Sequence, residues 1–241
     1  MVIAEHSQKI ILLWGVGLLI GFSLAWAFLY RMLPPPSPEL SPAEIADHYT
    51  QYATPIRMGA LVASYTSAFL VPFSLVVAFQ LARIETGKPV WAVLSFAGGC
   101  FFSLFQVLPG VIWGLIAFDA ARHPDISWTL NQFANLLLVS TDQYYMFQMV
   151  AIAYVGLKAN PDPLSAFPRW LCFLNIFVAI VFAVGGPSFF FKHGPFAWDG
   201  LIVFWLPTIG FFIWLVATNV CMWRALTRQE AASSTHWEGA S

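Results

Sequence analysis

The residues best suited to chemistry in this sequence gather around one acid, Asp142, inside a long apolar stretch. Thr141, Gln143, Tyr144 and Tyr145 flank it. A carboxylate deep in a bilayer costs about 2.5–3.5 kcal/mol on insertion scales, so it should face protein or water rather than lipid. We therefore treat Asp142 as a candidate functional carboxylate.

Other polar side chains share the predicted helix with Asp142. Asn131, Asn135, Asp142 and Tyr145 recur at spacings of three, four and seven residues, which places them on one helical face. Several polar groups directed at one volume are typical of a ligand site. The predicted ligand-binding or coupling residues are Asp142, Asn135, Asn131, Tyr145, Tyr144, Gln148 and Gln106.

Two states of Asp142 are physically acceptable, because no basic residue lies at a matching depth. A protonated Asp142 would form a hydrogen bond between helices and would contribute about 1–2 kcal/mol to the stability of the fold. An ionised and hydrated Asp142 at the bottom of an outward-open cavity would be a proton or cation site. In a third interpretation, Asp142 and Tyr144 or Tyr145 form the acid–base pair of an intramembrane enzyme.

The composition determines the class of protein. The chain has 241 residues, of which 59% are hydrophobic and 10% charged, whereas soluble domains carry about 25% charged residues. Its eleven basic residues are scattered singly and the net charge is −1, which argues against a nucleic-acid partner. Neither a metal-ligand pattern nor a nucleotide or cofactor fingerprint is found, so the sequence predicts no metal and no cofactor.

Six apolar segments are long enough to cross a hydrocarbon core of about 30 Å as helices. Their continuous apolar runs lack the alternation of a β-barrel. We predict an all-α integral membrane protein, with residues 1–227 forming one domain and residues 228–241 a disordered cytoplasmic tail. The six predicted helices cover residues 10–33, 57–82, 90–118, 128–157, 169–187 and 199–223.

The number of Lys and Arg residues in the loops sets the predicted orientation. With both termini on one side, that side has seven basic residues and the other has four, which predicts a cell inner membrane protein with both termini in the cytoplasm. The seven are Lys9, Arg83, Lys88, Lys158, Arg169, Arg224 and Arg228, and the four are Arg31, Arg57, Arg122 and Lys192.

The first predicted outer loop, residues 33–57, begins with a proline-rich stretch. Ser41-Pro42-Ala43-Glu44 then matches a capping box with proline at the first helical position. Ile45, Tyr49 and Tyr52 follow at helical spacing. We predict a short amphipathic helix between the first two membrane helices, lying across the outer mouth of the bundle.

The last outer loop, residues 185–200, combines glycine and proline with many aromatic residues. Such a loop could fold into the mouth of the bundle as a lid, or lie at the membrane interface as part of an aromatic belt. Arg57 is predicted to pair with Asp119, Asp125 or Asp199 at the surface. The predicted outer gate consists of Arg57, Asp119, His193, Trp198 and Asp199.

Three functions remain open from the sequence. The leading hypothesis is binding or translocation of a small, largely apolar or aromatic molecule, with protonation of Asp142 as the coupling step. The alternative is a non-catalytic subunit that binds a partner membrane protein or sister protomers. It predicts a filled, dry interior. The third is the intramembrane enzyme, which requires a second titratable group within hydrogen-bond reach of Asp142.

Overall fold

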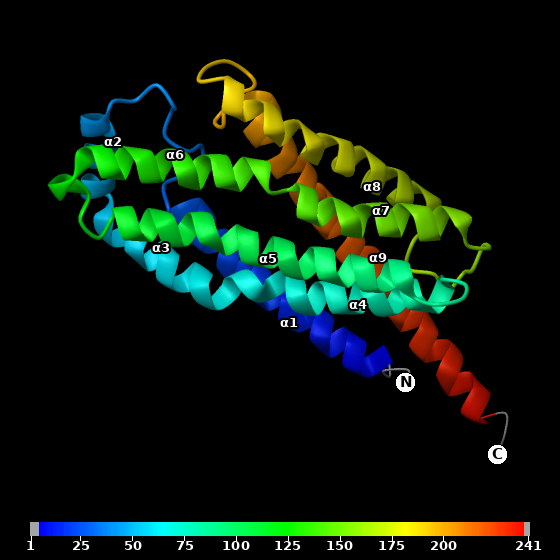
Figure 1. Cartoon of the computed structure of the whole chain (residues 1–241). Coiled ribbons are helices and arrows are strands. Elements are labelled where there is room, and N and C mark those ends of the chain that lie inside the picture. The colour runs from blue at the N-terminus through cyan, green and yellow to red at the C-terminus, as the bar shows by residue number, and fades with distance from the viewer. Residues whose placement is uncertain (1–4, 239–241) are drawn as a thin grey trace.

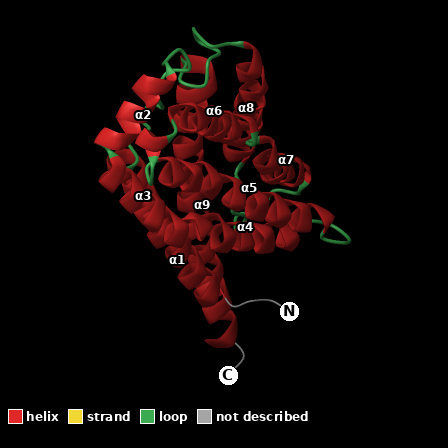
Figure 2. Ribbon diagram, turned by 60° about the vertical axis from the view of Figure 1, so that its left-hand side comes forward, coloured by secondary structure: helices red, strands yellow, loops and turns green. Residues whose placement is uncertain are grey.

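The computed structural model describes residues 5–238 and shows an elongated bundle of helices, with no strand in this part of the chain (Figures 1 and 2). The helical segments in chain order are α1 (Glu5–Leu24), η1 (Ala25–Leu29), α2 (Pro42–Gln51), α3 (Ala53–Thr66), η2 (Ser67–Phe69), α4 (Leu70–Ile84), α5 (Val90–Ile116), η3 (Ala120–Arg122), α6 (Pro124–Ser140), α7 (Gln143–Lys158), α8 (Arg169–Phe182), η4 (Ala183–Phe190), η5 (Leu201–Trp205) and α9 (Leu206–Glu238).

Within residues 5–238, five continuous helical stretches are long and apolar enough to cross a membrane. They cover Glu5–Leu29, Ala53–Ile84, Val90–Ile116, Arg169–Phe190 and Leu201–Ser234. They coincide with five of the six predicted segments, and their ends differ from the predicted ones by up to eleven residues. The all-helical membrane class is therefore confirmed.

The prediction of one continuous helix over residues 128–157 is wrong, because the chain breaks next to Asp142. α6 ends at Ser140 and α7 begins at Gln143, and the two run end to end (Figure 1). The Thr141 hydroxyl donates to the Leu137 carbonyl oxygen at 2.9 Å, and the Tyr145 N–H donates to the Asp142 carbonyl three residues before it, at 3.0 Å. These local bonds replace the regular helical pattern.

Gly185 of η4 packs closely against the end of α6, beside this break. A Cβ atom on Gly185 would lie 1.7 Å from the Val139 carbonyl oxygen, a distance that no side chain tolerates. Only glycine allows the two backbones to approach this closely. The break in the fourth predicted helix is therefore packed tightly against the segment that follows α8.

The outer surface of the bundle is apolar over much of its length. Large hydrophobic side chains such as Ile20, Phe101, Ile180 and Val216 are more than half exposed. In a soluble protein an apolar surface of this extent would promote aggregation, whereas in a bilayer it contacts lipid chains. The exposed residues therefore agree with the membrane class that the helices indicate.

α2 begins with the capping box that the sequence predicts. The Glu44 N–H is bonded to the Ser41 hydroxyl, and the Ser41 N–H to the Glu44 carboxylate. α2 packs beside α6 and α3, and its buried Tyr49 donates a hydrogen bond of 2.8 Å to Asn131.

At the opposite end of the bundle, three buried glutamines join α1, α4 and α9. Gln80 of α4 donates to Gln8 of α1 at 2.9 Å, and it exchanges hydrogen bonds of 3.1 and 2.8 Å with Gln229 of α9. Gln229 also donates to the Leu164 carbonyl. We call Gln8, Gln80 and Gln229 the glutamine cluster.

The predicted disordered tail is helical as far as the structure describes it. α9 continues to Glu238, and residues 239–241 lie outside the described residues. The sequence after residue 228 is polar, but Gln229 is only 4% exposed. Its hydrogen bonds to Gln80 and to the Leu164 carbonyl hold this part of α9 against the bundle. Composition alone does not predict these contacts.

Candidate functional site

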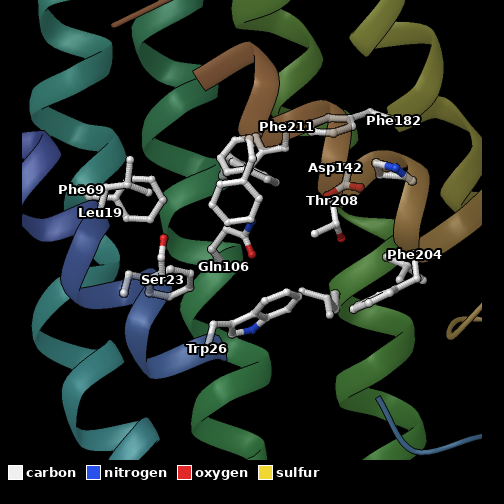
Figure 3. A pocket seen from close by; sticks show the side chains of 16 residues that line it. Leu19, Ser23, Trp26, Phe69, Gln106, Asp142, Phe182, Phe204, Thr208 and Phe211 are labelled. Carbon is white, nitrogen blue, oxygen red and sulfur yellow. The ribbon is translucent and has the colours of Figure 1, made fainter. Parts of the chain in front are cut away.

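The site begins with a cavity inside the bundle, beside the break between α6 and α7 (Figure 3). It encloses about 590 Å³ of empty space, including its open mouth. Segments far apart in the sequence line it. The lining residues are Leu19, Phe22, Ser23, Trp26, Phe69, Phe102, Gln106, Leu138, Val139, Asp142, Phe182, Phe204, Pro207, Thr208, Phe211 and Phe212.

Asp142 contributes the only charged or acidic side chain of this lining. It is 9% exposed and stands at the position that precedes α7. An aspartate there commonly caps the helix by accepting a backbone N–H bond, but the Asp142 side chain makes no such bond. No hydrogen bond to its carboxyl group is found among the described residues. The carboxyl group therefore lines the cavity without a partner.

Aromatic rings form most of the cavity wall. Phe102, Phe182 and Phe211 pack against one another with ring centroids 5.9–6.2 Å apart. At the end nearer the 185–200 loop, Trp26 and Phe204 are stacked with centroids 5.9 Å apart and close this side of the cavity (Figure 3). The wall is therefore largely apolar, with a few polar groups.

Two short π-helical segments carry the stacked pair. Trp26 lies in η1 and Phe204 in η5. Pro207 follows η5 and lacks the N–H that a regular helix would use, which helps to explain the irregular winding there. Single π turns occur frequently at functional sites because they redirect side chains. Here both of them face the cavity.

Some residues of the cavity lining reach the surface of the bundle. Ser23 of α1 and Thr208 of α9 both line the cavity and are partly exposed. Phe212 is 39% exposed and belongs to the outer face of α9, together with Ile209 and Val216, yet it also lines the cavity. The cavity thus reaches the apolar surface of the bundle.

Three uncharged polar side chains share the cavity with Asp142. They are Ser23, Gln106 and Thr208. Figure 3 shows Asp142 and Thr208 next to each other, with Gln106 directed toward the same space. A molecule in the cavity would therefore meet aromatic carbon on most sides and these four polar groups.

The predicted site residues are only partly brought together. Asp142 and Gln106 line the cavity, but the other five do not. Tyr145 is buried behind the wall, stacked on Phe102 with centroids 4.5 Å apart. Asn135 donates to Asn131 at 3.1 Å, and Asn131 accepts from Tyr49 of α2. The two asparagines thus join α2 to α6.

Tyr144 and Gln148 lie in two further environments. Tyr144 is 39% exposed and stacks on Phe105 at the outer surface of the bundle. Gln148 is buried and accepts a hydrogen bond of 3.3 Å from Ser74 of α4. The expectation that the polar stripe points at one volume is therefore wrong. α6 packs beside α2 and α5, and α7 packs beside α4 and α5, so the polar side chains along the two helices meet different neighbours.

Three of the predicted gate residues meet the first outer loop. Trp198 donates a hydrogen bond of 2.9 Å to the Pro36 carbonyl, and His193 lies 3.8 Å from the Glu39 carboxylate. Asp199 lies close to Ser37, and burial raises the pKa of its carboxyl group. The 185–200 loop is therefore folded onto the proline-rich stretch of the first loop.

The other two predicted gate residues lie elsewhere. Arg57 is exposed and donates to the carbonyl of Ala53 in its own helix, at 3.3 Å. Asp119 pairs instead with Arg122, three residues later, at 3.6 Å. The predicted pairing of Arg57 with an outer acid is wrong, since neighbours in the chain satisfy both groups.

The sequence analysis missed Trp26, Phe204 and Thr208 as site residues. Pro207 was a usable signal, because a proline inside an apolar helix marks irregular backbone where side chains can be redirected. Trp26 carried no comparable signal, as it stands in an unbroken apolar run. Within residues 5–238, no three His, Cys, Asp or Glu side chains are close enough to hold a metal ion.

Comparison of the chain with protein-family models, with curated proteins and with solved structures finds no match. The functional argument therefore depends on the geometry of the cavity and on the chemistry of its lining.

Proposed function

We propose that this chain is a membrane protein that binds or translocates a small, largely apolar or aromatic molecule through the cavity beside Asp142. The observation that carries the proposal is a carboxyl group without a partner on the wall of an aromatic cavity. Burying such a group is costly unless something binds it or a proton neutralises it. Proton uptake and release by Asp142 would be the coupling step of translocation.

The lining of the cavity supports a compact, largely apolar ligand. Ligand sites are commonly concave, with apolar walls and a few polar groups that fix orientation. The residues around this cavity have that composition. Asp142, Gln106 and Thr208 are the groups that would orient the ligand.

The two other hypotheses have less support. An intramembrane enzyme needs an acid–base partner for Asp142, and no second titratable side chain lines the cavity. An assembly subunit needs a filled interior, whereas this interior contains a cavity with polar groups. We retain the subunit hypothesis as the alternative, because the outer aromatic faces are also compatible with sister protomers.

The proposed topology has six membrane crossings in a cell inner membrane. α6 and α7 contain 17 and 16 residues, and together they would form one broken crossing. Both termini would then lie in the cytoplasm, as the excess of Lys and Arg at that end favours. α2 would be an amphipathic helix on the outer side, beside the mouth of the bundle.

A binding measurement with a blocked cavity tests the proposed function. We would titrate purified protein in detergent with 4-phenylbutanol and follow the heat of binding. The wild type is expected to show one saturable site. Thr208→Trp, which places an indole in the cavity, should weaken binding at least about tenfold.

Thr129→Trp is the matched control, because Thr129 is exposed on α6 and does not line the cavity. This variant should bind like the wild type. Equal binding by the wild type and both variants would place the probe outside the cavity. Absence of saturable binding to the wild type, for this probe and for its amine and acid analogues, would refute the proposal.

A further inference from the structure

The charge of the cavity lining indicates which kind of molecule fits it. Of the sixteen lining residues, Asp142 alone is ionisable, and no Lys, Arg or His faces it from α1, η1, η2, α5, α8, η5 or α9. From this imbalance and the aromatic walls we propose that the ligand is an amphipathic organic cation, whose ammonium group binds Asp142 and whose apolar body lies among the rings. The inference rests on the proposed function and specifies its ligand class.

The sign of the charge follows from the polar groups around Asp142. The C-terminal end of α6 and the N-terminal end of α7 meet at Asp142, so their opposite helix-end charges largely offset each other. The carboxyl group then determines the potential in the cavity. An organic anion would find no basic partner there, whereas an ammonium group would supply the hydrogen-bond donor and the positive charge that the carboxylate lacks.

The walls are also suited to a cation. Aromatic rings attract ammonium groups through their electron-rich faces, and tryptophan does so most strongly. Trp26 and Phe204 cover one end of the cavity, and Phe182 and Phe211 lie across the cavity from Trp26 (Figure 3). A cage of this type stabilises a cation that has left water, which partly offsets the cost of its desolvation.

The position of the mouth favours a ligand that dissolves in the membrane. Phe212 lies both on the exposed apolar face of α9 and on the cavity wall, so the entrance opens toward the lipid-facing side. The Trp26–Phe204 stack and the contact of Trp198 with Pro36 lie toward the loop end of the cavity. A molecule with an apolar body and one amine partitions into a bilayer with its charge near the interface, and it would reach Asp142 through the seam between α1 and α9.

Three probes of equal length separate charge from shape. They are 4-phenylbutylamine, 4-phenylbutanol and 4-phenylbutyrate, which differ only in the terminal group. Each is titrated at pH 7.5 into the wild type, Asp142→Asn and Thr208→Trp. The wild type should bind the amine about ten to a hundred times more tightly than the alcohol, and should bind the acid most weakly.

Asp142→Asn should abolish the preference for the amine while it still binds the alcohol, because the amide keeps the shape and loses the charge. Equal affinity of the wild type for amine and alcohol, with both lost in Thr208→Trp, would overturn the cation assignment and leave the proposed function standing. Amine binding that survives unchanged in Thr208→Trp would show that the cation binds at another surface, and it would overturn the inference as well.

Folding of the variants is checked independently. The glutamine cluster lies at the other end of the bundle, so Gln80→Ala serves as a variant with altered stability but an unaltered cavity. It should keep the amine preference of the wild type at a temperature where it remains folded. Loss of the preference in this variant would show that selectivity follows general stability rather than Asp142, which would contradict the inference.

Discussion

Two of the places where this bundle buries polar side chains do so in opposite ways. In the glutamine cluster, Gln80 is hydrogen-bonded to both Gln8 and Gln229. At the break between α6 and α7, Asp142 is buried to a similar degree but lines a cavity without a hydrogen-bond partner. The first region ties helices together, whereas the second leaves a bonding group unused.

The presence or absence of a hydrogen-bond partner separates stabilising polar groups from functional ones in an apolar bundle. In a network of fully hydrogen-bonded amides, the hydrogen bonds offset the free-energy cost of burying the polar groups, so the network contributes to stability. A carboxyl group without a partner destabilises the fold unless a ligand or proton completes it. We therefore expect mutations in the two regions to have opposite effects on stability.

The largest effect should come from Gly185, which holds the break in place. In Gly185→Ala the new methyl group would overlap the Val139 carbonyl, and separating η4 from α6 should cost about 3 kcal/mol in the free energy of unfolding. The measurement is unfolding by SDS in mixed micelles. Gly186→Ala is the control, because a Cβ atom there meets nothing within 4 Å. Equal stability of the two variants would contradict the close packing of the break.

The next effect tests the glutamine cluster. Gln80→Leu removes the hydrogen-bond partner that Gln8 and Gln229 share, and the loss of these three buried hydrogen bonds should lower the free energy of unfolding by about 2 kcal/mol. Gln143→Leu, at an exposed position, should change stability far less. A small effect at Gln80 would mean that the cluster does not hold α1, α4 and α9 together.

Asp142→Leu should change stability less, and in the opposite direction. The substitution removes no hydrogen bond and places an apolar side chain against aromatic walls, so the free energy of unfolding should stay within about 1 kcal/mol of the wild type or rise. The same SDS titration measures it. A loss of stability comparable with that of Gln80→Leu would show that Asp142 holds helices together through a hydrogen bond, and the contrast between the two regions would disappear.

The smallest effect concerns pH at the loop end of the bundle. Burial lowers the pKa of His48 in α2 from its ordinary value of 6.5. The unfolded chain therefore binds more protons below about pH 6.5, and stability falls as the pH decreases through the folded-state pKa. Thermal unfolding at pH 8 and pH 5.5 should show a slightly larger loss for the wild type than for His48→Gln. Identical losses would place the acid sensitivity elsewhere.

Much of the fold could be predicted from the sequence, because lipid imposes a simple requirement on the chain. Long apolar runs must be helical there, and this predicted five helices that the structure contains. The capping box at Ser41 was equally visible, since its residues and spacing carry the mechanism. Asp142 was identified because an acid at that depth is costly.

The break and the composition of the site could not be predicted with the same reasoning. Ser140, Thr141 and Asp142 are three consecutive poor helix formers, and this was the local signal for an interruption. The packing of Gly185 against Val139 involves residues more than forty positions apart. The cavity wall draws on α1, α5, α8 and α9 at once, and a periodicity argument describes only one helix at a time.

The first and last long helices of the bundle, α1 and α9, are in direct contact. Lys9 of α1 lies over the Trp223 ring of α9, with its ammonium nitrogen 5.5 Å from the centroid, and it also bonds to Glu230. Because these two helices are neighbours, a covalent connection between them would not change which helices pack together. A circular permutation that joins α9 to α1 through a short linker and opens the connection at residues 85–89 would keep the same residues around the cavity.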